Sequence, residues 1–103
     1  KHALVMAERL RRSRQPERAA RYYEAAIEGA RRHYYLNDQA LASECYAAFL
    51  LARGHAFLAA VALREAMRLY RQWKAHAKVR QLNARYAECF GAPGEGPEID
   101  LRR

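Results

Sequence analysis

The sequence predicts an all-α fold of about five helices, arranged as antiparallel hairpins. Apolar residues recur at spacings of three and four along most of the chain, which is the period of an amphipathic helix. Strands are not expected, because the chain contains no threonine, few β-branched residues and no alternating apolar and polar run. About half of the 103 residues are apolar, which is enough for one domain with a packed core.

Turn signals divide the chain up to residue 90 into helices. The segment 13–16 (SRQP) ends the first helix and starts the second, since Pro16 fits a first helical turn. Gly54 fits the left-handed residue just past a helix end. Asn37 or Asp38 is a suitable N-cap for the third helix. Helices are therefore expected at about 2–13, 17–35, 38–53, 56–73 and 76–90.

Two of these helices have informative apolar faces. The last carries one stripe, which predicts one buried side and one wet side. The fourth carries two stripes, which predicts neighbours on two sides. The stripe residues are Val79, Leu82, Tyr86 and Phe90 in the last helix, and Ala59, Leu63, Ala66, Met67 and Tyr70 with Leu58, Ala62 and Leu69 in the fourth.

The C-terminal residues differ in composition, because Gly and Pro make up five of the seven residues 91–97. Residues 1–90 are interpreted as one helical-repeat domain and residues 91–103 as a linker or disordered tail. The chain opens on Lys1 rather than methionine, so we interpret it as a fragment of a longer protein. It has no signal-peptide pattern and no apolar run near the ~18–20 residues that cross a membrane, which favours a cytoplasmic location.

An internal repeat with a period of about 40 residues is the strongest single signal. When the sequence is shifted by one period, Ala19 and Ala26 fall on Ala59 and Ala66. A fixed period of this length is typical of a solenoid of helical hairpins, in which small residues allow close helix crossings. The residues expected at these crossings are Ala7, Ala19, Ala26, Ala47, Ala59, Ala66 and Ala87, with Gly54 at the turn.

This pattern resembles the tetratricopeptide repeat (TPR), which has small residues at the eighth, twentieth and twenty-seventh positions of its unit. Ala47, Ala59 and Ala66 stand there in the central repeat, although Ser43 replaces the usual aromatic residue at the fourth position. The unit is also longer than the usual one, at about 40 residues rather than about 34. The resemblance implies a TPR-like right-handed solenoid. Its partner-binding groove would be lined by Glu8, Arg11, Arg12, Glu44, Gln81 and Glu88.

Residues 38–90 are also similar to the last repeats of large bacterial and fungal multi-domain signalling ATPases. The motifs are NDQALASECYAAFLLARG, LREAMRLYRQW and AKVRQLNARY, in that order. In that family a serine/threonine-kinase-like domain and an AAA-type ATPase domain precede the array, and a GAF domain and a histidine kinase or similar output follow. The family has glycine after the tryptophan, where this chain has Lys74, so continuity between the fourth and fifth helices stays open. The resemblance implies a non-catalytic scaffold between an ATPase region and a sensor or kinase output.

No catalytic residue, cofactor or metal site is expected in the chain. The glycine-rich segment 91–96 lacks the Lys-Ser/Thr pair of a phosphate-binding P-loop. The four histidines have no partner at metal-ligand spacing. Cys45 and Cys89 are interpreted as buried free thiols in a reducing compartment.

The net charge of +8 leaves an alternative open. Residues 1–36 carry nine Lys/Arg against four Glu, which suits a basic helical domain that binds nucleic acid. A third alternative is the repeat module of an ATPase-switch transcription regulator or cyclase. The interpretation favours protein partners over nucleic acid and membrane: other domains of the same chain, a peptide or a second copy. The clustered arginines are Arg9, Arg11, Arg12, Arg14, Arg18 and Arg21.

Overall fold

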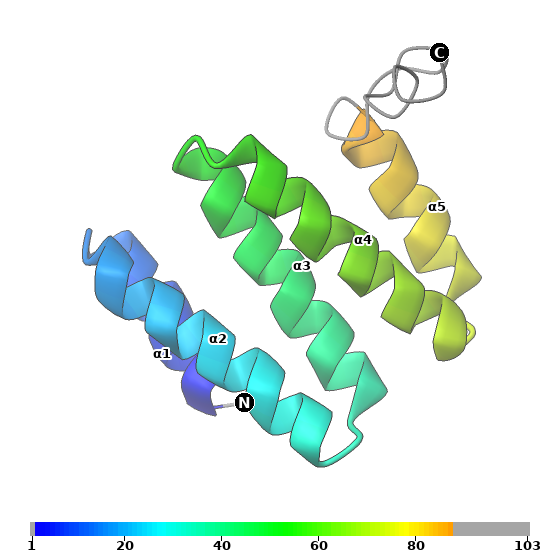
Figure 1. Cartoon of the computed structure of the whole chain (residues 1–103), viewed down its shortest axis with the longest axis horizontal. Coiled ribbons are helices and arrows are strands. Elements are labelled where there is room, and N and C mark those ends of the chain that lie inside the picture. The colour runs from blue at the N-terminus through cyan, green and yellow to red at the C-terminus, as the bar shows by residue number, and fades with distance from the viewer. Residues whose placement is uncertain (1, 88–103) are drawn as a thin grey trace, which may run out of the picture.

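A computed structural model of the chain describes residues 2–87 (Figure 1). This part of the chain is all-helical and contains no strand. The expected tail, 91–103, lies outside the described residues. The helices are α1 (His2–Arg12), α2 (Pro16–Arg32), α3 (Leu36–Ala52), α4 (Ala56–Gln72) and α5 (His76–Arg85).

The helices recur at a regular interval. Each of α2, α3 and α4 has 17 residues, and a turn of the same length separates every helix from the next. Helix starts are therefore equally spaced along the chain, at Pro16, Leu36, Ala56 and His76. One period of the sequence repeat thus corresponds to a pair of helices.

The four turns between helices share one backbone conformation. The middle residue of each has a positive φ, at 63° for Arg14, 60° for Tyr34, 84° for Gly54 and 65° for Lys74. The next residue then donates its N–H to the carbonyl five positions earlier, which is the Schellman pattern at a helix C-terminus. These bonds are Gln15 to Leu10, Tyr35 to Ala30 and His55 to Leu50, each at 2.9 Å, and Ala75 to Tyr70 at 2.8 Å.

The two expected helix boundaries beside the turn between α2 and α3 were wrong. Helix α2 ends at Arg32 rather than near 35, and α3 begins at Leu36, with Tyr35 rather than Asn37 or Asp38 as its N-cap. That N-cap makes no side-chain hydrogen bond. The turn that precedes α3 contains no glycine or proline. Tyr34 itself adopts the left-handed conformation there.

Helices α4 and α5 are separate elements. Lys74 adopts the left-handed conformation and takes the place of a turn glycine. Helix α5 ends at Arg85, before the expected end at 90. Its Val79 and Leu82 are buried and Tyr86 is partly buried, whereas Phe90 lies outside the described residues.

The helices pack in chain order, α1 on α2, α2 on α3, α3 on α4 and α4 on α5 (Figure 1). Helix α4 therefore has neighbours on two sides, as its two apolar stripes predict. All of its first stripe is buried, and so is Leu69 of the second, but Leu58 is 51% exposed. The buried residues form two clusters: Ala7, Leu10, Ala19, Tyr23, Phe49, Leu50 and Ala59 in the first, and Ala40, Ala66, Met67, Leu69, Tyr70, Val79 and Leu82 in the second.

Candidate partner-binding surface

The residues expected to line a groove come from α1, α3 and α5. Arg11, Arg12 and Gln81 are exposed, whereas Glu8 and Glu44 are partly buried. The sixth residue, Glu88, lies outside the described residues. The two glutamates make bonds within the chain, so they contribute to the packing of the helices as well as to the surface.

Glu8 joins α1 to α2. The hydroxyl of the buried Tyr23 donates to its Oε2 at 2.5 Å, and Arg11 Nη2 lies 2.9 Å from its Oε1. Burial acts to raise the pKa of Glu8, but the hydrogen bonds from Tyr23 and Arg11 outweigh it, so this pKa is lowered. Burial, and then the bond to the carboxylate, raise the pKa of Tyr23.

Glu44 joins three helices. Tyr70 of α4 donates its hydroxyl to Glu44 Oε1 at 2.9 Å, and Lys78 of α5 lies 3.3 Å from the carboxylate. The Glu44 side chain is only 13% exposed, so this ion pair is better shielded from water than an ordinary surface pair. The Lys78 ammonium also lies 5.7 Å from the centre of the Tyr70 ring. Burial, followed by the bond to Glu44, raises the pKa of Tyr70.

A third tyrosine–glutamate bond joins α2 to α3. The Tyr46 hydroxyl donates to Glu24 Oε2 at 2.8 Å. Burial and this bond raise the pKa of Tyr46 to about 12. Sequence reasoning missed all three bonds, because their partners are 15, 22 and 26 residues apart and follow no local spacing.

Cys45 is half-buried and is a free thiol. Burial first, and then the negative charges of Glu8 and Glu44, raise its pKa to about 11. The thiol therefore stays protonated at neutral pH, which makes it a poor nucleophile and metal ligand. Cys89 lies outside the described residues.

Two other features are absent from the described part of the chain. Residues 2–87 contain no group of three or more His, Cys, Asp or Glu side chains that could hold a metal ion. None of their helices combines the length and apolar character needed to cross a membrane.

The alanines expected at the helix crossings occupy three kinds of position. Ala26 is partly buried, and Ala87 is exposed because it lies beyond the end of α5. The remaining five are fully buried: Ala7, Ala19, Ala47, Ala59 and Ala66.

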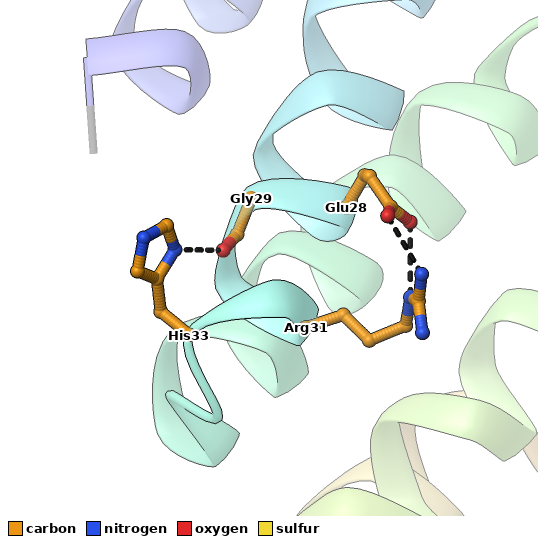
Figure 2. Close-up of polar contacts among 4 residues, drawn as sticks. All are labelled: Glu28, Gly29, Arg31 and His33. Carbon is orange, nitrogen blue, oxygen red and sulfur yellow. Dashed lines mark hydrogen bonds and ion pairs between the residues drawn. The ribbon is translucent and has the colours of Figure 1, made fainter.

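An apolar groove of about 770 Å³ lies between α1, α2 and α3 and is here called the N-terminal groove. His33 and Gly29 both line this groove, and His33 Nδ1 lies 2.9 Å from the Gly29 carbonyl. Arg31 pairs with Glu28 on another side of α2 (Figure 2). Its walls include Leu4 from α1, Ala26, Gly29 and Ala30 from α2, and Leu41 and Ala42 from α3.

A smaller hollow of about 550 Å³ lies near the turns that follow α1 and α3. Arg11, Arg14 and Arg53 line it together with Pro16, Phe49 and Ala52. Within the described residues no carboxylate pairs with Arg14 or Arg53.

In comparisons with known proteins, no protein-family model, no curated protein and no solved structure matches this chain.

Proposed function

We propose that this chain is a non-catalytic, TPR-like right-handed solenoid segment that acts as a scaffold and protein-interaction module. It would lie in the cytoplasm, within a multi-domain signalling protein, and connect an ATPase region to a sensor or kinase output. The observation that carries the proposal is the recurrence of one turn geometry at equal intervals, at Arg14, Tyr34, Gly54 and Lys74. A chain of identical turns suits an array of repeated helices better than a fold built around one site.

The contacts between helices support a rigid spacer. Each helix packs on its neighbours in the chain, as in a one-dimensional array. Tyrosine–glutamate bonds join α1 to α2, α2 to α3 and α3 to α4. The pair of Lys78 and Glu44 reaches from α5 to α3, past one intervening helix in the chain.

A distance measurement between spin labels tests this rigidity. The labels would be attached at Arg21→Cys and Val61→Cys, two exposed positions on α2 and α4, after Cys45 and Cys89 are replaced by serine. A control pair at Phe57→Cys and Arg71→Cys within α4 gives the width that the labels alone contribute. We expect one narrow distance distribution of similar width for both pairs. A broad or multiple distribution for the pair between helices would contradict a rigid scaffold.

The arginine-lined hollow favours nucleic acid binding as a second candidate function. Unpaired guanidinium groups bind backbone phosphates, and such binding weakens steeply with salt. Fluorescence anisotropy with a labelled duplex would then show binding at low salt that is reduced by Arg14→Ala or Arg53→Ala. Arg80→Ala, at an exposed position on α5, is the matched control. Absence of binding at low salt removes this candidate.

A further inference from the structure

The arginine-lined hollow brings together two turns that are far apart in the sequence. Arg14 lies in the turn between α1 and α2, and Arg53 directly follows α3. Both turns lie at the same end of the molecule (Figure 1), and both arginines line the hollow of about 550 Å³. Arg11, in the last turn of α1, is the third arginine of its lining. Three guanidinium groups from two helical hairpins therefore border one concave space.

The positive charge of the hollow is balanced only in part. Arg11 is paired with Glu8, whose Oε1 lies 2.9 Å from Arg11 Nη2. Among the ion pairs of residues 2–87, none includes Arg14 or Arg53. The lining of the hollow therefore keeps two positive charges that no carboxylate of these residues compensates. Like charges that border one space attract an anion that can bind both of them.

Arg11 and the floor of the hollow are held in place by contacts with the core. Glu8, the partner of Arg11, also accepts a hydrogen bond from the buried Tyr23. A guanidinium group has five N–H donors, so the bond from Nη2 to Glu8 leaves others for a ligand. Phe49 of the floor is buried, and its ring centre lies 5.1 Å from that of Tyr23. A site that is ordered before binding loses less entropy when a ligand binds.

The arginines of the hollow do not belong to the repeating pattern of the chain. A shift of one repeat period replaces each of them with an uncharged residue. The counterparts of Arg11, Arg14 and Arg53 are Leu51, Gly54 and Ser13. The turn at Gly54 has the same backbone conformation as the turn at Arg14. The turn geometry therefore does not require a guanidinium group, and these side chains are available for another role.

We propose that the arginine-lined hollow is a binding site for a phosphate monoester. Arg14 and Arg53 bind the phosphate oxygens, and Arg11 donates a further hydrogen bond. A phosphate monoester carries a charge of about −1.5 to −2 at pH 7, which matches the two uncompensated guanidinium groups. Each phosphate of a nucleic acid backbone carries a single charge and matches them less well. The organic part of the ester lies against Pro16 and Ala52, which also line the hollow.

The phosphate monoester can come from two sources, a phosphorylated side chain of a protein or a small phosphorylated molecule. Both present the same dianion to the arginines, so the chemistry of the site is shared and the experiments assign the source. This inference goes beyond the scaffold function and does not rest on it. Nucleic acid competes for the same hollow, and its binding is one of the outcomes tested.

The first experiment compares phenyl phosphate with phenyl sulfate as ligands of the full chain. The two esters have nearly the same shape, but the sulfate ester carries only one negative charge. The Nε–H signals of the arginine side chains report binding in an NMR titration at low salt and neutral pH. We expect phenyl phosphate to bind at least about fivefold more tightly than phenyl sulfate. Equal affinities, or no saturable binding of phenyl phosphate, would overturn the proposal.

The second experiment removes the arginines one at a time. Arg14→Gly should fold at least as stably as the original chain, because Arg14 has a φ of 63°. Arg53→Gln removes the other charge and keeps much of the side-chain length. We expect each variant to bind phenyl phosphate at least about fivefold more weakly. Arg80→Gln, at an exposed position of α5, is the matched control for net charge and should change the affinity less than about twofold. Equal weakening by all three would reduce the effect to general charge attraction and overturn the site.

A phosphopeptide separates the two sources of the ligand. The probe is a short peptide with one phosphotyrosine between glycines. Binding at least as tight as that of phenyl phosphate supports a phosphorylated protein side chain as the ligand, whereas weaker binding supports a small phosphorylated molecule. The labelled DNA duplex tests the competing occupant. A duplex that binds through Arg14 and Arg53, without binding of phenyl phosphate, would overturn the proposal in favour of nucleic acid. The spin-label distance between α2 and α4 is independent of these results, so the scaffold proposal stands or fails separately.

Discussion

The tyrosine–glutamate bonds are the most specific polar contacts at the residue scale. A phenol that donates to an ionised carboxylate makes a charge-assisted bond, which is stronger than a neutral one. Tyr23 is fully buried, and its partner Glu8 also binds Arg11. These tyrosine–glutamate bonds hold adjacent helices at a fixed register. Packing of small alanine side chains alone would specify that register less precisely.

Tyr23→Phe tests the contribution of one such bond. We expect a loss of about 1–2 kcal/mol in the free energy of unfolding, because Glu8 stays partly buried but loses a donor. Tyr46→Phe is the control, since its bond to Glu24 is exposed and should contribute less. Urea denaturation of both variants measures the difference. Equal losses of unfolding free energy in the two variants would mean that burial of the carboxylate does not strengthen the bond.

Lowering the pH should destabilise the folded chain, because Glu8 becomes protonated. Its pKa is lowered below the ordinary value of 4.5 in the folded chain, so the folded state binds its proton less readily than the unfolded state. The stabilisation is therefore present above pH 4.5 and is lost as the pH falls through the lower, folded-state pKa. Denaturation midpoints between pH 7 and pH 3 measure this loss. A Glu8→Gln variant should show a shallower decline over the same range.

Two glycines should respond oppositely to substitution by alanine. Gly29 lies inside α2, and a Cβ added there meets no atom within 4 Å. Gly29→Ala should therefore stabilise the chain by about 0.5–1 kcal/mol, through helix propensity and a less flexible unfolded state. Gly54 has a φ of 84°, so Gly54→Ala should destabilise it by about 1–2 kcal/mol. Thermal unfolding checks both signs, and the same sign for the two variants would contradict this prediction.

At the scale of the helices, the sequence showed where helices occur more clearly than how they end. Pro16 and Gly54 marked two turns correctly, because these residues have strong backbone preferences. Tyr34 and Lys74 carry no such signal, yet both adopt the left-handed conformation. The neighbouring helices fix that conformation through the Schellman bonds and tertiary packing, which local propensity does not report.

Lys74→Gly should raise stability by about 0.5–1 kcal/mol. Glycine adopts a positive φ without the steric strain of about 1–2 kcal/mol that a Cβ causes, although its greater freedom when unfolded offsets part of this gain. Lys74→Ala retains the Cβ and is the matched control. Thermal unfolding of both variants measures the effect, and a loss of stability with glycine would show that the lysine side chain itself supports the turn.

The helix crossings provide a further test of packing. Ala59 is fully buried in the first cluster, beside Ala19 of α2 and Phe49 of α3. Ala59→Leu should overpack this crossing and cost about 1–3 kcal/mol. Ala48→Leu, at an exposed position of α3, should change stability little. An unchanged denaturation midpoint for Ala59→Leu would reject close packing at this crossing.

At the scale of the whole molecule, periodicity was the best guide. The all-helical class and the two-sided packing of α4 followed from spacings of apolar and small residues. The contacts of the candidate partner-binding surface could not be predicted from these spacings. The partners of Glu8 and Glu44 come from other helices and follow no fixed offset. The N-terminal groove is lined by Gly29, whereas Leu69, one repeat period later, is buried in the second cluster. This difference in side-chain size predicts a groove only when the neighbours of both residues are known.

The equal spacing of the turns also constrains how such a chain can change in length. Successive helices run in opposite directions (Figure 1), so an insertion as long as two helices and their turns leaves every downstream helix running in its present direction. An insertion half as long adds a single helix and reverses the direction of every later one. A change by whole hairpins therefore preserves the end of the molecule at which the chain leaves its last helix, whereas an odd number of added helices moves that exit to the opposite end.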